Sequence, residues 1–345
     1  MKTTTATSRR FPDRRVSVAP MMGWTDRHDR YFMRLITPHA LLYTVMITTG
    51  ALTYGKKFEV LDFSEQEHPL ALQLGGSDPA EMAACTKLAK QWGYDEVNIN
   101  CGCPSERVQK GQFGACLMAA PKLVGECVDA MKQAAPDLPV TVKTRIGIDA
   151  QDSYEFLVDF VGASAEKGCE TFIIHARKAI LGGLSPAENR TIPPLNYETA
   201  YRLKRDFPHL EIILNGGIKD IPTIHQALSK LDGVMIGREA YSNPWFMRTV
   251  EQEVYGTTSP LTREDVIEAM IPYIEAQIAT GEVALKDITR HLLGLYQGCY
   301  GARGFRRLLS TEAYKPGAGI SVVRAALELV TRARPQDSEN SSAAA

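Results

Sequence analysis

The sequence predicts an α/β fold: a (β/α)8 TIM barrel followed by a C-terminal all-helical domain. Eight short apolar runs rich in β-branched residues alternate with segments of helical pattern over residues 16–256. After residue 262, only amphipathic helical patterns remain. The competing architecture is a doubly wound sheet, which typically carries GxGxxG after its first strand. That turn reads PMMGWTD here, so the barrel is the favoured prediction.

The predicted strands are near-continuous apolar runs, as is typical of parallel strands that are buried on both faces. Each run is separated from the next by enough chain for one helix, so the repeated unit is βα. The strands are expected at 16–20, 41–47, 69–74, 96–100, 139–143, 171–175, 211–215 and 233–237.

Capping signals place the intervening helices. Asp78 is a predicted N-cap, Pro79 occupies the first helical position, and Gly93 ends the same helix. Similar signals open helices at Pro121, at Asp152 or Ser153, and at Pro222. Three further segments, 263–281, 286–310 and 321–334, have helical patterns and no strand between them.

These patterns predict four parts of the chain. Residues 1–15 form an N-terminal extension without a readable pattern, and 16–256 form the barrel. Residues 262–334 form the helical domain, and the polar tail 335–345 is expected to be disordered.

The charge is balanced over the whole chain, with 39 Lys and Arg against 40 Asp and Glu. This balance argues against a uniformly basic nucleic-acid binder, but it does not exclude a local basic surface. Segment 286–334 holds nine basic and three acidic residues, with Tyr296, Tyr300 and Phe305 among them. The composition suits contact with an RNA backbone, although a solvated helix face is the alternative.

Several classes of protein are disfavoured. No apolar run is long enough for a transmembrane helix, and the N-terminus lacks the apolar centre of a secretory signal, so a cytoplasmic protein is expected. The odd count of seven cysteines indicates free thiols. Cys101 and Cys103 have no companion pair of Cys or His nearby, so no metal site is expected. No surface for self-association can be recognised, and a monomer is expected.

Residues at the carboxyl ends of barrel strands line the active site of this fold. The loops after strands seven and eight often bind phosphate, and Gly216, Gly217 and Arg238 suit an anion there. Lys143 at a strand end needs an anion or an electron-rich ring such as a flavin, and Gln73 offers a donor and an acceptor to such a ring. Taken singly, these could be ordinary satisfied polar residues. The set is Pro20, Met21, Met22, Gln73, Asn98, Asn100, Lys143, His175, Asn215, Gly216, Gly217, Gly237 and Arg238.

Cys103 is the candidate general acid. It lies between Gly102 and Pro104 in the long loop after the fourth strand. A cysteine thiol is mostly protonated at neutral pH and can deliver a proton. Cys101 and Cys116 are the rival thiols, because one directly follows the strand and the other lies before the next helix.

Seven segments together resemble the tRNA-dihydrouridine synthase family. They cover most of residues 16–246 and read APMMGWTD, LQLGG, NINCGCPSERVQKGQFGACL, VTVKTRIG, IIHARKAILGGLSPAENRTIPPL, ILNGGI and VMIGREAYSNPW. The resemblance is to the bacterial subfamily that acts on tRNA D-loop uridines 20 and 20a. It implies an FMN enzyme that uses NADPH to reduce the uracil C5=C6 bond.

The same resemblance implies roles for individual residues. Cys103 would protonate C5 after hydride transfer from FMN to C6, and Asn100 and Arg177 would help hold the uracil. Arg190, Arg303 and Arg306 are expected to contact tRNA. FMN would be held by Pro20, Met21, Met22, Gln73, Lys143, His175, Asn215, Gly216, Gly217, Gly237 and Arg238.

Two alternatives remain open from the sequence. One is an FMN-dependent small-molecule oxidoreductase of the dihydroorotate dehydrogenase or ene-reductase kind, which has no need of a basic helical domain. The other is a noncatalytic RNA-binding protein on a barrel scaffold.

Overall fold

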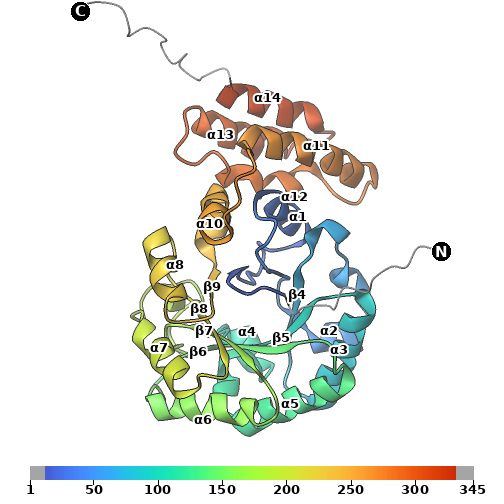
Figure 1. Cartoon of the computed structure of the whole chain (residues 1–345). Helices are drawn as coiled ribbons and strands as arrows, with labels where there is room; N and C mark the ends of the chain where they lie inside the picture. The colour runs from blue at the N-terminus through green and yellow to red at the C-terminus, as the bar shows by residue number, and fades with distance from the viewer. Residues whose placement is uncertain (1–11, 332–345) are drawn as a thin grey trace, which may run out of the picture.

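A closed parallel barrel forms the larger part of the computed structural model, which describes residues 12–331 (Figure 1). Its strands are hydrogen-bonded in the order β1-β9-β8-β7-β6-β5-β4-β2, and a single parallel bridge between Ser17 and Leu41 closes the ring. All pairings between named strands are parallel, as the sequence predicts. The strands are β1 Val16–Val18, β2 Leu42–Tyr43, β3 Ile47–Thr48, β4 Leu70–Gly75, β5 Glu96–Cys101, β6 Val140–Arg145, β7 Thr171–His175, β8 Glu211–Asn215 and β9 Gly233–Ile236.

The strand predicted at 41–47 is split into β2 and β3, which both pair with β4. The Thr44 hydroxyl accepts a hydrogen bond from the Gln73 N–H at 3.1 Å and donates to the Val45 carbonyl at 2.8 Å. A side chain therefore takes the place of a backbone acceptor in the ladder, and the strand is interrupted there.

Helices surround the barrel, and their ends follow the predicted caps (Figure 1). The Asp78 carboxylate accepts from the Glu81 N–H at 2.9 Å, and Gly93 ends that helix with a φ of 93°. Ser153, rather than Asp152, caps the helix that begins at Tyr154. The outer helices are α1 Arg27–Ile36, α3 Pro79–Trp92, α5 Pro121–Ala134, α6 Tyr154–Ala165, α7 Tyr197–Asp206, α8 Ile221–Leu228 and α10 Trp245–Tyr255.

The C-terminal helices lie together beyond one end of the barrel (Figure 1). They are α11 Arg263–Ala279, α12 Leu285–Thr289, α13 Ala302–Glu312 and α14 Ile320–Thr331. The segment predicted helical over 286–310 is interrupted between α12 and α13. Gly298 and Gly301 have φ values of 79° and 78° in this interruption, a left-handed conformation that ends a helix.

Polar and aromatic contacts dock the helical part onto the loop after β1 and onto α1. Arg290 pairs with Asp26 and also donates to the Gly23 carbonyl at 2.9 Å. The rings of Tyr31 and Tyr273 stack with centroids 3.9 Å apart. Across residues 12–331, the longest apolar helical stretch falls short of what a membrane crossing requires.

Arg14 closes the amino-terminal end of the barrel, although it belongs to the segment predicted as an extension. Its guanidinium is buried and pairs with Glu96 at 2.6 Å and Glu211 at 2.9 Å. The Glu96 carboxylate also accepts from the Tyr43 hydroxyl at 2.5 Å and the Thr141 hydroxyl at 2.7 Å. The segment before β1 thus supplies, through the Arg14 side chain, the cation that the buried Glu96 carboxylate needs.

Removal of this cation should destabilise the whole barrel. We expect Arg14→Leu to lower the free energy of unfolding by about 3–5 kcal/mol, because Glu96 is left buried without its cation. Urea unfolding followed by circular dichroism would measure the change. Arg205→Leu is the control, since its pair with Glu198 is exposed and should contribute about 0.5 kcal/mol or less. Equal effects of the two variants would contradict a stabilising role of the buried pair.

Candidate active site

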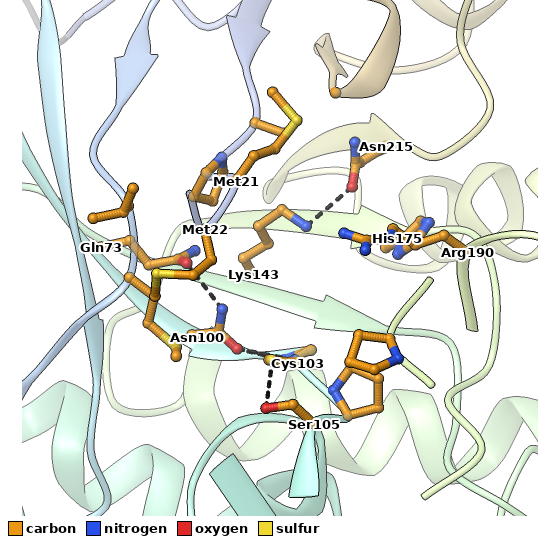
Figure 2. Close-up of a pocket in the computed structure, with 18 of the residues that line it drawn as sticks. Met21, Met22, Gln73, Asn100, Cys103, Ser105, Lys143, His175, Arg190 and Asn215 are labelled. Carbon is orange, nitrogen blue, oxygen red and sulfur yellow. Dashed lines mark hydrogen bonds between the residues drawn. The ribbon is translucent and has the colours of Figure 1, made fainter. Parts of the chain in front are cut away.

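A cavity of about 910 Å³ opens at the carboxyl ends of the strands (Figure 2). Fourteen of the predicted site residues line it, although they come from all parts of the barrel. These are Pro20, Met21, Met22, Gln73, Asn100, Cys103, Lys143, His175, Arg190, Asn215, Gly216, Gly217, Gly237 and Arg238.

Four predicted residues lie elsewhere, and one of them, Asn98, is buried inside the barrel between Gln73 and Thr141. The Arg177 guanidinium donates to the backbone carbonyls of Thr191 and Pro193 and does not line the cavity. Arg303 and Arg306 are exposed on α13. Contacts of the three arginine side chains with a substrate remain predictions.

The cavity wall carries a strong excess of positive charge. Among the lining residues, the only acid is Glu239. Such a surface attracts anions, and it binds a phosphate or a negatively charged ring more tightly than it binds a cationic ligand. The basic lining residues are Arg107, Lys143, Arg145, Arg190, Lys219 and Arg238.

Lys143 is the base with the most perturbed environment. It projects from β6, and its Nζ donates to the Asn215 Oδ1 at 3.0 Å (Figure 2). Burial and the neighbouring Arg145 lower the pKa of Lys143 to about 7. Burial, together with Arg145 and Lys143, also holds the pKa of His175 well below its usual value, so the imidazole is neutral at pH 7. An anion in the cavity would favour the charged form of the lysine.

Gly216 and Gly217 form a close backbone approach after β8. Their φ values are 114° and 69°, which L-residues with a side chain rarely adopt. A Cβ on Gly216 would lie 2.6 Å from the His175 ring, and one on Gly217 would lie 2.5 Å from Leu195. The pair therefore leaves backbone amides, rather than side chains, at this part of the wall.

The loop after β5 presents Cys103 to the cavity. The Asn100 Oδ1 accepts from the backbone N–H of Gly102 at 3.1 Å and from that of Cys103 at 3.0 Å. The Cys103 thiol lies 3.6 Å from the Ser105 hydroxyl (Figure 2).

The rival thiols occupy different surroundings. Cys101 is fully buried within β5, and Cys116 donates to the Phe113 carbonyl at 3.0 Å. Burial raises the pKa of both thiols. Neither lines the cavity, so Cys103 is the one of the three with access to a ligand there.

Sequence reasoning missed Arg145, which is buried beside the cavity. Its guanidinium donates to the carbonyls of Gly102, Lys178 and Asn189 at 3.0, 3.1 and 2.8 Å. It therefore ties the Cys103 loop to the loop after β7. Two bases spaced two residues apart on one strand share a face, so the VKTR pattern could have identified it.

Comparison with known proteins shows the family of the chain. The dihydrouridine synthase (Dus) family model matches residues 17–331. The chain belongs to the dihydrouridine synthase family. Within that family it is similar to the tRNA-dihydrouridine(20/20a) synthase of Shewanella oneidensis, with 60% identity over 92% of this chain and 94% of the relative. The protein of the same name from Escherichia coli K12 is 57% identical over 93% of this chain and 92% of the relative.

A solved structure with low sequence identity to this chain shares the barrel. The old yellow enzyme homologue from Zymomonas mobilis aligns with a TM-score of 0.52 at 12% identity, over 72% of this chain and 90% of that chain. This likeness supports the barrel fold of the family member described here.

Loss of the Arg145 guanidinium should loosen both loops at once. We expect Arg145→Met to raise amide hydrogen exchange in 102–105 and 178–190 by about tenfold or more, because three backbone carbonyls lose a charge-assisted donor. Mass spectrometry of deuterated peptides would measure this. Arg107→Met, an exposed base on the same cavity, is the control. Unchanged hydrogen exchange in the Arg145 variant would rule out the role of Arg145 in holding the Cys103 loop against the loop after β7.

Proposed function

We propose that this protein is an FMN-dependent tRNA-dihydrouridine synthase that reduces D-loop uridines 20 and 20a with NADPH as the reductant. The observation that carries the proposal is a single accessible thiol, Cys103, in a cavity lined by cations at the mouth of a barrel. The names of the close relatives support the tRNA substrate.

The cavity residues fit FMN in two places. Gly216, Gly217, Gly237 and Arg238 would bind the phosphate through backbone amides and a guanidinium. Lys143 would face the ring edge that gains negative charge on reduction, because it is a buried base beside an uncharged amide. Pro20, Met21, Met22, Gln73, His175 and Asn215 complete the proposed set.

The reaction adds a hydride to C6 and a proton to C5 of the uracil. Bound FMN would supply the hydride, with NADPH as the source of its electrons. Cys103 would hold the proton for C5, since its thiol faces the cavity and its backbone is fixed by Asn100. The thiolate that forms would then regain its proton from solvent, since Cys103 lines a cavity that opens at the barrel mouth.

Segment 262–334 is proposed as the tRNA-binding domain of the enzyme. Arg303 and Arg306 are exposed on α13, where phosphates could reach them, and Arg190 lies at the cavity wall. Asn100 and Arg177 are proposed to help hold the uracil. The target base must leave the D-loop to enter the barrel mouth, and backbone contacts outside the cavity would offset that cost.

This arrangement favours a tRNA substrate over a small molecule. A small-molecule FMN oxidoreductase would need the barrel cavity but not an exposed basic helix beside it. A tRNA substrate also supports the cytoplasmic location expected from the sequence. We also propose that the enzyme is a monomer, as expected from the sequence.

Removal of the proposed acid should separate the two halves of the reaction. We expect Cys103→Ala to lower uridine reduction by about 10²–10⁴-fold, because no other thiol lines the cavity. NADPH should still bleach the bound flavin, followed by absorbance. Cys116→Ala is the matched control and should reduce uridine like the wild type. Wild-type uridine reduction by the Cys103 variant would exclude it as the acid, and protein that never binds FMN would exclude the cofactor.

The proposed tRNA surface can be tested through salt dependence. We expect Arg303→Ala and Arg306→Ala each to weaken tRNA binding and to lower the slope of log affinity against log salt by about 0.7–0.9, the value for one phosphate contact. Filter binding at several salt concentrations would measure the slope. Arg205→Ala changes an exposed arginine on α7 and should leave the slope unchanged. An unchanged slope for both α13 variants would place the RNA surface elsewhere.

A further inference from the structure

A continuous row of buried polar side chains crosses the barrel interior from its floor to the Cys103 loop. The Asn100 Nδ2 donates to the Gln73 Oε1 at 2.9 Å (Figure 2), and the Gln73 Nε2 donates to the Asn98 Oδ1 at 2.8 Å. The Asn98 Nδ2 donates to the Thr141 hydroxyl at 2.9 Å, and that hydroxyl donates to the Glu96 carboxylate at 2.7 Å. These five side chains are called the polar row below.

The floor end of the polar row permits only one direction of hydrogen bonding. An ionised carboxylate accepts and cannot donate. Glu96 is fully buried and remains paired with Arg14, so Thr141 must donate to it. The oxygen of Thr141 is then free to accept from Asn98, and each amide above is held in a matching orientation.

The groups at the cavity end of the polar row require the same donor-to-acceptor direction of the hydrogen bonds. The backbone N–H groups of Gly102 and Cys103 can only donate, and the Asn100 Oδ1 accepts from both. A flipped Asn100 amide would set its NH2 group against these two donors. Gln73, Asn98 and Thr141 are at most 1% exposed, so water cannot readily replace a broken link.

We propose that Thr141 is a positioning residue for the reaction, acting through the polar row to hold the Asn100 oxygen against the Cys103 loop. Thr141 touches neither the cavity nor Cys103. Its hydroxyl joins the Glu96 carboxylate, which can only accept hydrogen bonds, to the three amide side chains. Through them it fixes the position of the Cys103 thiol without contacting it. The proposal deepens the proposed function and rests on it for the reaction, but the placement of the thiol can be measured by itself.

The test compares two near-isosteric losses of a buried hydroxyl. Thr141→Val removes the link between Asn98 and Glu96, whereas Thr86→Val removes a hydroxyl that bonds within α3, to the Met82 carbonyl. The first readout is the rate at which iodoacetamide alkylates Cys103 in the folded protein, resolved by peptide mass spectrometry with Cys299 as the internal reference. The second readout is the rate of uridine reduction with tRNA and NADPH. Circular dichroism melts confirm that each variant is folded.

We expect Thr141→Val to raise Cys103 alkylation about tenfold, because one lost buried hydrogen bond frees the loop. Uridine reduction should fall by a similar factor at saturating tRNA, while Cys299 alkylation and the Thr86 variant stay at wild-type values. Thr141→Ser restores the hydroxyl and should rescue both readouts, which a change in packing alone would not do.

Cys103 alkylation at the wild-type rate in folded Thr141→Val would overturn the proposal, and so would equal changes in the Thr86 variant. If Thr141→Val does not fold, Asn98→Ser breaks the same row one link higher and must give the same rise. If alkylation rises but even the wild type reduces no tRNA uridine, the placement of the thiol by the polar row stands and the proposed function fails.

Discussion

The buried ion pair between Arg14 and Glu96 is the constraint on which the interior of this barrel depends. A carboxylate without water must have a cation and filled acceptor positions, and Glu96 obtains both from residues of three separate segments. The negative charge of Glu96 also fixes the direction of the hydrogen bonds along the polar row, from Thr141 to the Cys103 loop. A requirement of folding at the barrel floor thereby becomes a requirement on geometry at the barrel mouth.

The site is assembled by loops whose positions are set from inside the fold. Asn100 fixes the Cys103 loop from the barrel interior, and Arg145 fixes it from the adjoining strand. On the opposite side, Gly216 and Gly217 expose backbone amides because no side chain fits there. The helical part is docked on the β1 loop through Arg290 and is thus held near the same rim.

Much of this structure could be predicted because buried parallel strands leave a clear trace in sequence. The apolar runs ending at His175 and Asn215 match β7 and β8 residue for residue, and their polar ends line the cavity. The sequence could not predict the break after Tyr43, because it depends on where one threonine hydroxyl finds a backbone partner. Arg14 was missed for a related reason: its segment has no pattern, and its role exists only once Glu96 is buried nearby.

The lowered pKa of Lys143 links ligand capture to proton uptake. Because burial lowers the pKa of Lys143 to about 7, its amine can lose its charge near neutral pH, and the ligand-free barrel avoids a fully uncompensated buried cation. An anion favours the charged form and raises this pKa. Above neutral pH, anion binding is therefore accompanied by proton uptake, and affinity declines as pH rises toward the pKa of the occupied state. Lys143 therefore becomes fully charged only when an anionic ligand binds beside it.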